Sequence, residues 1–170
     1  MARPGKLEVR KTLLIVGEGH DEKALLNHIK SLYCIRAVSV DVKNAGGKGP
    51  DHILNYAINC QEYSSRDIVG VLLDTDLVWP KELVKRTTEY GFQLIGTNPS
   101  IDGFVLDLLN EKKPLTTAKC KKKLSKLLPG PSTEKETYAK ILSKEMLDQS
   151  RTKNETLDDI INLIQGIKRK

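Results

Sequence analysis

Two short apolar segments of the sequence each end in acidic residues. Glu18 stands between Gly17 and Gly19 directly after the first segment, and Asp74 and Asp76 close the second. Carboxylates grouped in one place repel one another unless a cation lies among them, and oxygen-only ligands suit Mg²⁺ or Mn²⁺. A divalent ion held there can bind a phosphodiester, stabilise its transition-state charge and activate water. The acidic residues therefore predict metal-assisted phosphoryl transfer, and the two glycines would let the backbone turn and a phosphate approach.

The first hundred or so residues alternate between the period of a strand and that of a helix. Strand patterns cover residues 12–17, 36–44, 67–76 and 92–98, and helical spacing covers residues 20–33, 51–61, 79–91 and 100–111. This alternation predicts an α/β, Rossmann-like fold with a four-stranded parallel sheet and helices on both faces.

The alternation of strand and helix patterns ends near residue 112. Residues 113–170 show no strand pattern, and two or three helices are expected there, separated by residues 129–133 and 150–154. We therefore expect an α/β core over residues 1–112 and a basic helical C-terminal extension over residues 113–170 that packs on the core.

The predicted sheet brings the acidic residues together. In an open parallel sheet, functional groups collect outside the carboxyl ends of the strands, where the strand order reverses. If the order is 2-1-3-4, this point lies between the first and third strands, whose ends carry Glu18 and the pair Asp74 and Asp76. Alternate residues of a strand share a face, so both aspartates would point the same way. Two plainer interpretations stay open, because an acid after a strand often favours the next helix N-terminus and many Asp-x-Asp pairs bind no metal.

Composition sets broad limits on the class of protein. A formal net charge of +6 and an isoelectric point near 9.2 suit a polyanionic partner, although many other proteins share this balance. Cys34, Cys60 and Cys120 have no metal-binding or disulfide-type spacing, which is typical of reduced thiols in the cytoplasm. We expect a cytoplasmic protein with no signal peptide and no membrane span, because no segment approaches about 18 apolar residues.

Lysines gather in the first part of the extension. A lysine-rich helix is usually a solvated face, and contact with a phosphate backbone is the competing interpretation. Lys48 lies in the glycine-rich segment 44–50, which is either a flexible loop or a phosphate contact beside the acidic site. Aromatic residues are scarce, so Trp79 or Tyr138 could stack on a base only singly. The basic cluster comprises Lys112, Lys113, Lys119, Lys121, Lys122, Lys123 and Lys126.

Two nucleotide-binding motifs are excluded. The segment around Gly17 and Gly19 lacks the third glycine of a dinucleotide fingerprint, and the acids Asp21 and Glu22 would repel a pyrophosphate. The segment around Lys48 is not a Walker A motif, because no serine or threonine follows the lysine.

Four short motifs occur in an order that resembles a known family. They are Glu18-Gly19 before a helix, the pair Asp74 and Asp76, "NPSID" with Asn98, Pro99 and Asp102, and Tyr138-x-Lys140. Together they span roughly residues 10–145 and resemble the Toprim fold of topoisomerases, primases and related nucleases. Within that group the chain is most similar to the RloB-like family, stand-alone Toprim proteins of bacterial defence systems.

The resemblance implies a function and a set of roles. Glu18 would ligate metal or act as general acid or base, Asp74 and Asp76 would hold Mg²⁺ or Mn²⁺, and Asp102 would join them with support from Asn98. The activity implied is a metal-dependent nuclease acting on DNA or RNA, an effector of anti-phage or restriction-linked defence. The implied partners are nucleic acid and an SMC/ABC-like ATPase encoded nearby. The sequence leaves the oligomeric state open, with a homodimer as one alternative. The lysines expected to contact nucleic acid are Lys48, Lys119, Lys121, Lys122, Lys123, Lys126 and Lys140.

The chain departs from the family pattern at two positions. Asp102 stands where the family has glutamate, and Leu108 lies near the place of a helix histidine. These departures favour an alternative, a non-catalytic nucleic-acid-binding or ATPase-regulating module that keeps the fold. Intact Glu18, Asp74 and Asp76 favour the enzyme.

Overall fold

The computed structural model describes residue 5 and residues 9–169, and it contains a four-stranded, all-parallel sheet in the order β2-β1-β3-β4. This confirms the predicted α/β fold and strand order, an arrangement consistent with Rossmann-like and Toprim-type folds. The elements are β1 (Lys11–Gly17), α1 (His20–Tyr33), β2 (Val38–Asn44), α2 (Gly49–Tyr63), β3 (Ile68–Asp74), α3 (Lys81–Glu89), β4 (Gln93–Thr97), α4 (Ile101–Leu108), α5 (Thr117–Leu127), α6 (Lys135–Ile141), α7 (Lys144–Arg151) and α8 (Glu155–Ile164).

The pattern of each strand follows from its place in the sheet. β1 and β3 lie in the centre, and their continuous apolar runs are buried on both faces. β2 lies at an edge and alternates, with Val38, Val40 and Val42 buried and Ser39 exposed between them. The carboxyl ends of all four strands meet at one edge of the sheet, because every pairing is parallel.

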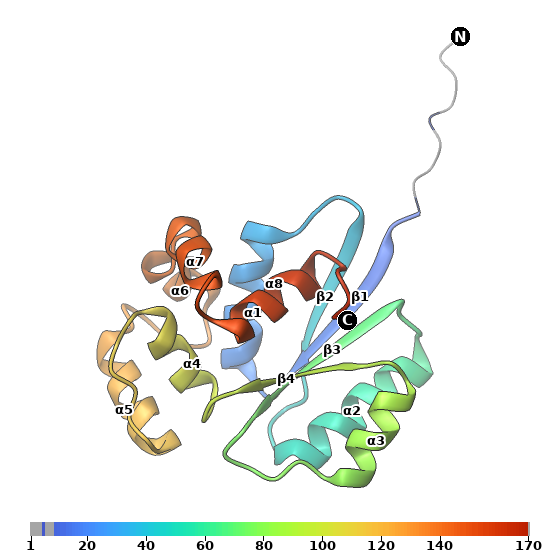
Figure 1. Ribbon diagram of the computed structural model, residues 1–170, viewed down its shortest axis with the longest axis horizontal. Helices are drawn as coiled ribbons and strands as arrows, with labels where there is room; N and C mark the ends of the chain where they lie inside the picture. The colour runs from blue at the N-terminus through green and yellow to red at the C-terminus, as the bar shows by residue number, and fades with distance from the viewer. Residues whose placement is uncertain (1–4, 6–8, 170) are drawn as a thin grey trace.

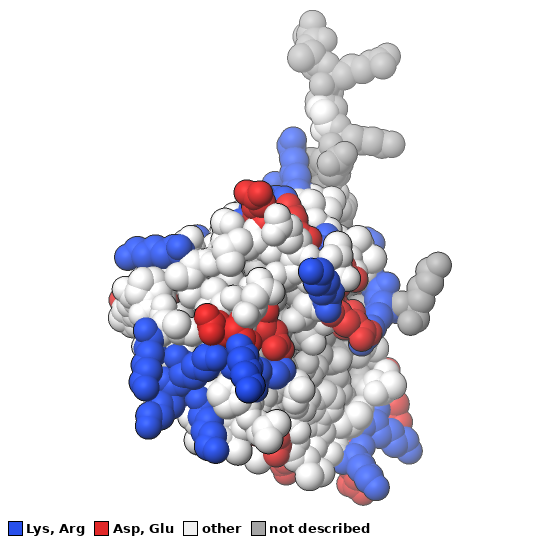
Figure 2. All heavy atoms as spheres, turned by 60° about the vertical axis from the view of Figure 1, so that its left-hand side comes forward, with Lys and Arg blue, Asp and Glu red and all other residues white. Residues whose placement is uncertain are grey.

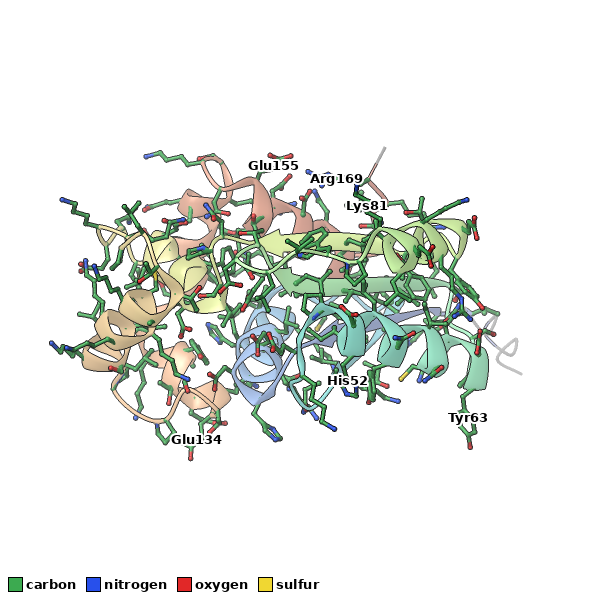
Figure 3. The ribbon with its side chains drawn as sticks, turned by 90° about the horizontal axis from the view of Figure 1, so that it is seen from below. His52, Tyr63, Lys81, Glu134, Glu155 and Arg169 are labelled. Carbon is green, nitrogen blue, oxygen red and sulfur yellow. The ribbon has the colours of Figure 1, made fainter. Side chains whose placement is uncertain are left out.

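Helices cover the two faces of the sheet in two separate apolar cores (Figure 1). One core joins the sheet to α1 and α8, and the other joins it to α2 and α3. α8 packs directly on β3, where a Cβ added to Gly70 would lie 2.2 Å from Leu163 Cδ2. The end of the chain folds back onto α8, since Arg169 pairs with Glu155 and Asp159 (Figure 3). The sheet core thus includes residues from both sides of the predicted domain boundary at residue 112, which itself stays a prediction.

The C-terminal part contains four helices, α5 to α8, where the sequence predicted two or three. The chain breaks at both predicted separators and once more, between α6 and α7. At this break Leu142 is fully buried, and the Ser143 hydroxyl accepts a hydrogen bond from Met146 N at 3.2 Å. A serine N-cap of this kind starts a new helix inside what looked like one helical pattern.

Other expectations from composition can be compared with the described residues. Cys34, Cys60 and Cys120 are all free thiols. Among residues 9–169, no helix combines the length and the apolar character needed to cross a bilayer. The prediction that no signal peptide is present falls mainly on residues 1–4 and 6–8, which lie outside the described part of the chain.

Candidate metal site at the carboxyl edge of the sheet

The turn after β1 places Glu18 at the edge of the sheet. Gly17 allows this turn, because a Cβ added there would lie only 2.6 Å from Glu22 Cβ in the first turn of α1. Two backbone hydrogen bonds from the loop after β2 stabilise this turn. Ala45 N donates to Gly17 O at 2.9 Å, and Gly47 N donates to Glu18 O at 2.8 Å. Glycine at position 17 therefore lets α1 start close to the end of the strand.

Glu22 lies beside this turn and is almost fully buried, with 8% of its surface exposed. Its Oε2 accepts a hydrogen bond from Gly19 N at 3.0 Å, which caps the first turn of α1. Burial, together with the smaller effect of the charges of Asp74 and Glu18, raises the pKa of Glu22 to about 7. Glu22 is a site residue that the sequence pattern does not single out, although its spacing from Gly19 is that of a capping box.

Asp74 is the last residue of β3 and is held from the neighbouring strand. Its Oδ1 accepts from Thr97 Oγ1 at 2.8 Å and from Ile101 N, at the start of α4, at 3.0 Å. Burial raises the pKa of Asp74 to about 6, and the charges of Glu18 and Asp76 act in the same direction. The carboxylate is thus rigidly placed in surroundings that disfavour its negative charge.

Glu18, Glu22 and Asp74 form one group, in which one carboxylate oxygen of each lies within 4.8 Å of the others. We call it the carboxylate group. Three negative charges at this separation repel one another, and a proton or a cation relieves the repulsion. The donors are all carboxylate oxygens, the set that Mg²⁺ and Mn²⁺ prefer. The residues present therefore fit a small divalent ion, although acidic groups are also common without one.

Asp76 lies next to this group but outside the set of three that the described residues form. β3 ends at Asp74, so Thr75 and Asp76 lie in a turn where strand alternation no longer applies. Asp76 N donates to Pro99 O at 3.0 Å, and its carboxylate accepts a short hydrogen bond from Thr117 Oγ1 at the start of α5. Asp76 therefore links the edge of the sheet to α5 and adds negative charge near Asp74.

Asp102 lines a different pocket, of about 130 Å³, together with Asp21, Lys121 and Ser132. Burial raises the pKa of Asp102, with a further contribution from the charge of Asp21. Ser132 Oγ donates to Asp21 Oδ1 at 2.8 Å. None of the three members of the carboxylate group lines this pocket. Asp76 and Asp102, which the resemblance groups with Glu18 and Asp74, thus lie outside the carboxylate group in this structure.

Asn98 supports the loops rather than the carboxylates. Its Oδ1 accepts from Thr75 Oγ1 at 3.2 Å, and its backbone oxygen accepts from Lys113 Nζ at 3.0 Å. The loop after β4 is thereby tied both to the turn after β3 and to the segment before α5.

The loop after β2 holds Lys48 near the carboxylate group. Gly46, Gly47, Lys48 and Gly49 all have left-handed backbone, with φ of 82°, 83°, 72° and 80°. His52, at the opposite end of α2 from Tyr63 (Figure 3), makes a 2.7 Å hydrogen bond to Ala45 O through Nε2. Lys48 is exposed and directly follows the residue that bonds Glu18 O.

The lysines of α5 lie at the same edge, since this helix begins at the contact between Thr117 and Asp76. Figure 2 shows blue side chains gathered beside a smaller group of acidic ones on this side of the molecule. Lys123 donates to Lys112 O at 2.6 Å and pairs with Glu111 at 3.3 Å. Lys113 pairs with Asp107 at 2.6 Å. The exposed lysines of the predicted set are Lys119, Lys121, Lys122 and Lys126 on α5, Lys140 on α6 and Lys48.

Of the two aromatic residues suggested for stacking, Tyr138 is buried and Trp79 is partly buried. Tyr138 is 1% exposed and donates to Ser132 O at 2.9 Å. The indole Nε1–H of Trp79 donates to Asp74 O at 2.9 Å, and its ring lies against Gly96. Both side chains stabilise the structure around the site from within.

Comparison of this chain with protein-family models, with curated proteins and with solved structures finds no match. The class of the site therefore rests on its own residues: a parallel α/β sheet with a carboxylate group at its carboxyl edge and exposed lysines beside it.

Proposed function

We propose that this protein is a metal-dependent phosphodiester hydrolase of the Toprim type that cleaves DNA or RNA. The observation that carries the proposal is the carboxylate group, which gathers Glu18, Glu22 and Asp74. Burial and neighbouring acids raise the pKa of Glu22 and of Asp74 there. A free-energy cost of this kind is repaid when a cation binds. The order of short motifs similar to the RloB-like family adds the expectation of a cytoplasmic effector of bacterial defence.

The residues of the site would have two kinds of role, metal binding and orientation of the metal ligands. Glu18, Glu22 and Asp74 would hold Mg²⁺ or Mn²⁺, and the bound ion would neutralise phosphate charge and activate water. Thr97 and Ile101 N keep Asp74 oriented, and Gly19 N keeps Glu22 oriented. Asp76 remains a candidate ligand through a small movement of its turn.

The exposed lysines supply the contact with substrate. Lys119, Lys121 and Lys122 lie on α5, whose first residue Thr117 donates to Asp76. Lys48 follows the residue bonded to Glu18 O. Lysines in such positions bind phosphates without reading sequence. The arrangement supports a polyanionic substrate that crosses the carboxylate group, and it leaves the choice between DNA and RNA to other contacts.

A second candidate is a nucleic-acid-binding or ATPase-regulating module without catalysis. It is favoured by Asp102, which lines a separate pocket, and by Leu108 near the expected histidine position. An SMC/ABC-like ATPase partner and a homodimer are compatible with either candidate.

A cleavage assay tests the proposal. Labelled single-stranded and duplex DNA and total RNA are incubated with Mn²⁺ or Mg²⁺ and with the wild-type protein or Glu18→Ala. Cleavage by the wild type that is lost in the variant and in EDTA supports the enzyme and identifies its substrate class. Equal residual cleavage by both proteins would point to a contaminant and would contradict the proposal. Binding without cleavage, with or without an added ATPase partner, would favour the second candidate.

A further inference from the structure

Three aliphatic side chains protrude into solvent beside the carboxylate group. Leu77 is 49% exposed, Val78 90% and Leu115 95%. Single exposed apolar residues are ordinary on protein surfaces, but neighbouring ones often mark a binding site. We call these residues the apolar rim.

Hydrogen bonds bring the two loops of the rim together. Leu77 and Val78 follow Asp76, whose carboxylate accepts from Thr117 Oγ1 two residues after Leu115. Both loops are also tied to the loop after β4: Asp76 N donates to Pro99 O at 3.0 Å, and Lys113 Nζ donates to Asn98 O at 3.0 Å. The two loops that carry the rim are therefore tied to each other and to the loop after β4, although they are far apart in the sequence.

Both segments are anchored on each side of the protruding residues. Val78 lies between Asp76, bonded to Pro99 O, and Trp79, whose indole is bonded to Asp74 O. Leu115 lies between Pro114, whose oxygen accepts from Cys120 Sγ, and Thr116, whose side chain caps α5. Exposure of these side chains is thus set by ordered backbone, which lowers the entropy cost of binding a ligand.

The charges around the rim select the kind of ligand. The exposed Lys119 and Lys122 lie on the helix that starts beside Leu115, and Lys112 precedes it. A second copy of the chain meeting this surface would bring these lysines toward their own counterparts, and like charges repel. A ligand that combines negative charges with flat apolar faces satisfies both parts of the surface, and an unstacked stretch of nucleic acid has this chemistry.

We propose that the apolar rim holds an unstacked nucleobase while the neighbouring lysines of α5 bind the adjoining phosphates. The inference rests on the proposed function and makes it more specific, because duplex nucleic acid keeps its base faces stacked. The protein would therefore favour single-stranded segments, loops or flipped bases over a continuous duplex.

Binding without divalent ions tests the rim separately from catalysis. Fluorescein-labelled single strands and a hairpin duplex of the same length are titrated in EDTA with wild type, Val78→Ser, Leu115→Ser and the double variant. We expect the double variant to lose about tenfold in affinity for the single strand and to keep its affinity for the duplex. Ile35→Ser is the matched control, since Ile35 is an exposed apolar residue in the connection between α1 and β2, at the opposite edge of the sheet.

Three outcomes overturn the inference. Unchanged affinity of the double variant for single strands, or equal losses for single strand and duplex, removes the rim as a base contact. A wild-type dimer that becomes monomeric in the double variant, measured by light scattering, would make the rim an interface between copies. Melting with Mn²⁺ separates the two proposals, because loss of the rim alone leaves stabilisation by the metal intact.

Discussion

Two acidic clusters lie at the carboxyl edge of this sheet and differ in what surrounds them. Asp21 and Asp102 share a pocket with Lys121 and with the hydroxyl donor Ser132. Burial raises the pKa of Asp102, and the charge of Lys121 offsets part of that rise. The charges that act on Glu22 and Asp74 are all acidic.

This difference bears on the role of each cluster. A lysine lies beside the acids in the pocket of Asp102, whereas the carboxylate group meets hydrogen-bond donors and further acids. A cluster whose charge is left uncompensated in a stable fold is the better candidate for binding a cation.

Cleavage gives the largest expected contrast between the two clusters. Asp74→Asn should lower Mn²⁺-dependent cleavage by at least about 100-fold, because it removes charge where phosphoryl charge must be stabilised. Asp102→Asn should leave the rate within about threefold of wild type. The check is initial rates on the substrate class that the wild type cleaves. Similar losses in both variants would show that the pocket of Asp102 belongs to the active site after all.

The second-largest expected effect is on the pH dependence of the unfolding free energy, and it concerns Glu22. The folded pKa of Glu22, about 7, lies above its ordinary value of 4.5. The folded state therefore binds more protons in this window, and the contribution of Glu22 to stability falls as pH rises from about 4.5 to 7.

Glu22→Gln should remove this fall and stabilise the metal-free protein at pH 8 by up to about 3 kcal/mol. Glutamine can still accept the hydrogen bond from Gly19 N, so the cap is retained. Urea unfolding in EDTA at several pH values measures the effect. A variant that is less stable than wild type at pH 8 would mean that Glu22 has a cationic partner in solution.

The smallest effect concerns the lysine beside Asp102. Lys121→Gln should destabilise the folded protein by no more than about 0.5 kcal/mol at neutral pH, because the group is exposed and screened. The matched control is Lys122→Gln, a neighbouring exposed lysine that does not line the pocket. Equal unfolding free energies for the two variants at low salt would show that Lys121 does not stabilise the acids of its pocket. The two acidic clusters would then no longer differ in this respect.

Much of the fold was readable from sequence because local patterns and topology agree. The continuous apolar runs of β1 and β3 predicted central strands, and their alternation with helices predicted the parallel order. The placement of Glu18 and Asp74 at one edge followed from that order. The separate start of α7 was missed, since it depends on the cap made by Ser143 rather than on periodicity.

The candidate site was harder to predict than the fold. Glu22 has the spacing of a helix cap, and its place among the carboxylates depends on the close approach that Gly17 permits. Asp76 was grouped with Asp74 by strand alternation, which ends where the turn begins. The apolar rim has no sequence signal, because the loops that carry Val78 and Leu115 are distant in the chain and are joined through the bond between Asp76 and Thr117.

The most direct test of the carboxylate group is thermal unfolding with Mn²⁺, measured at pH 7.5 for wild type, Asp74→Asn and Asp102→Asn. A site that binds the ion only in the folded state raises the melting temperature as its concentration increases. We predict a rise for wild type and Asp102→Asn and none for Asp74→Asn. Three identical curves with and without Mn²⁺ would contradict the central claim that Glu18, Glu22 and Asp74 form a metal site.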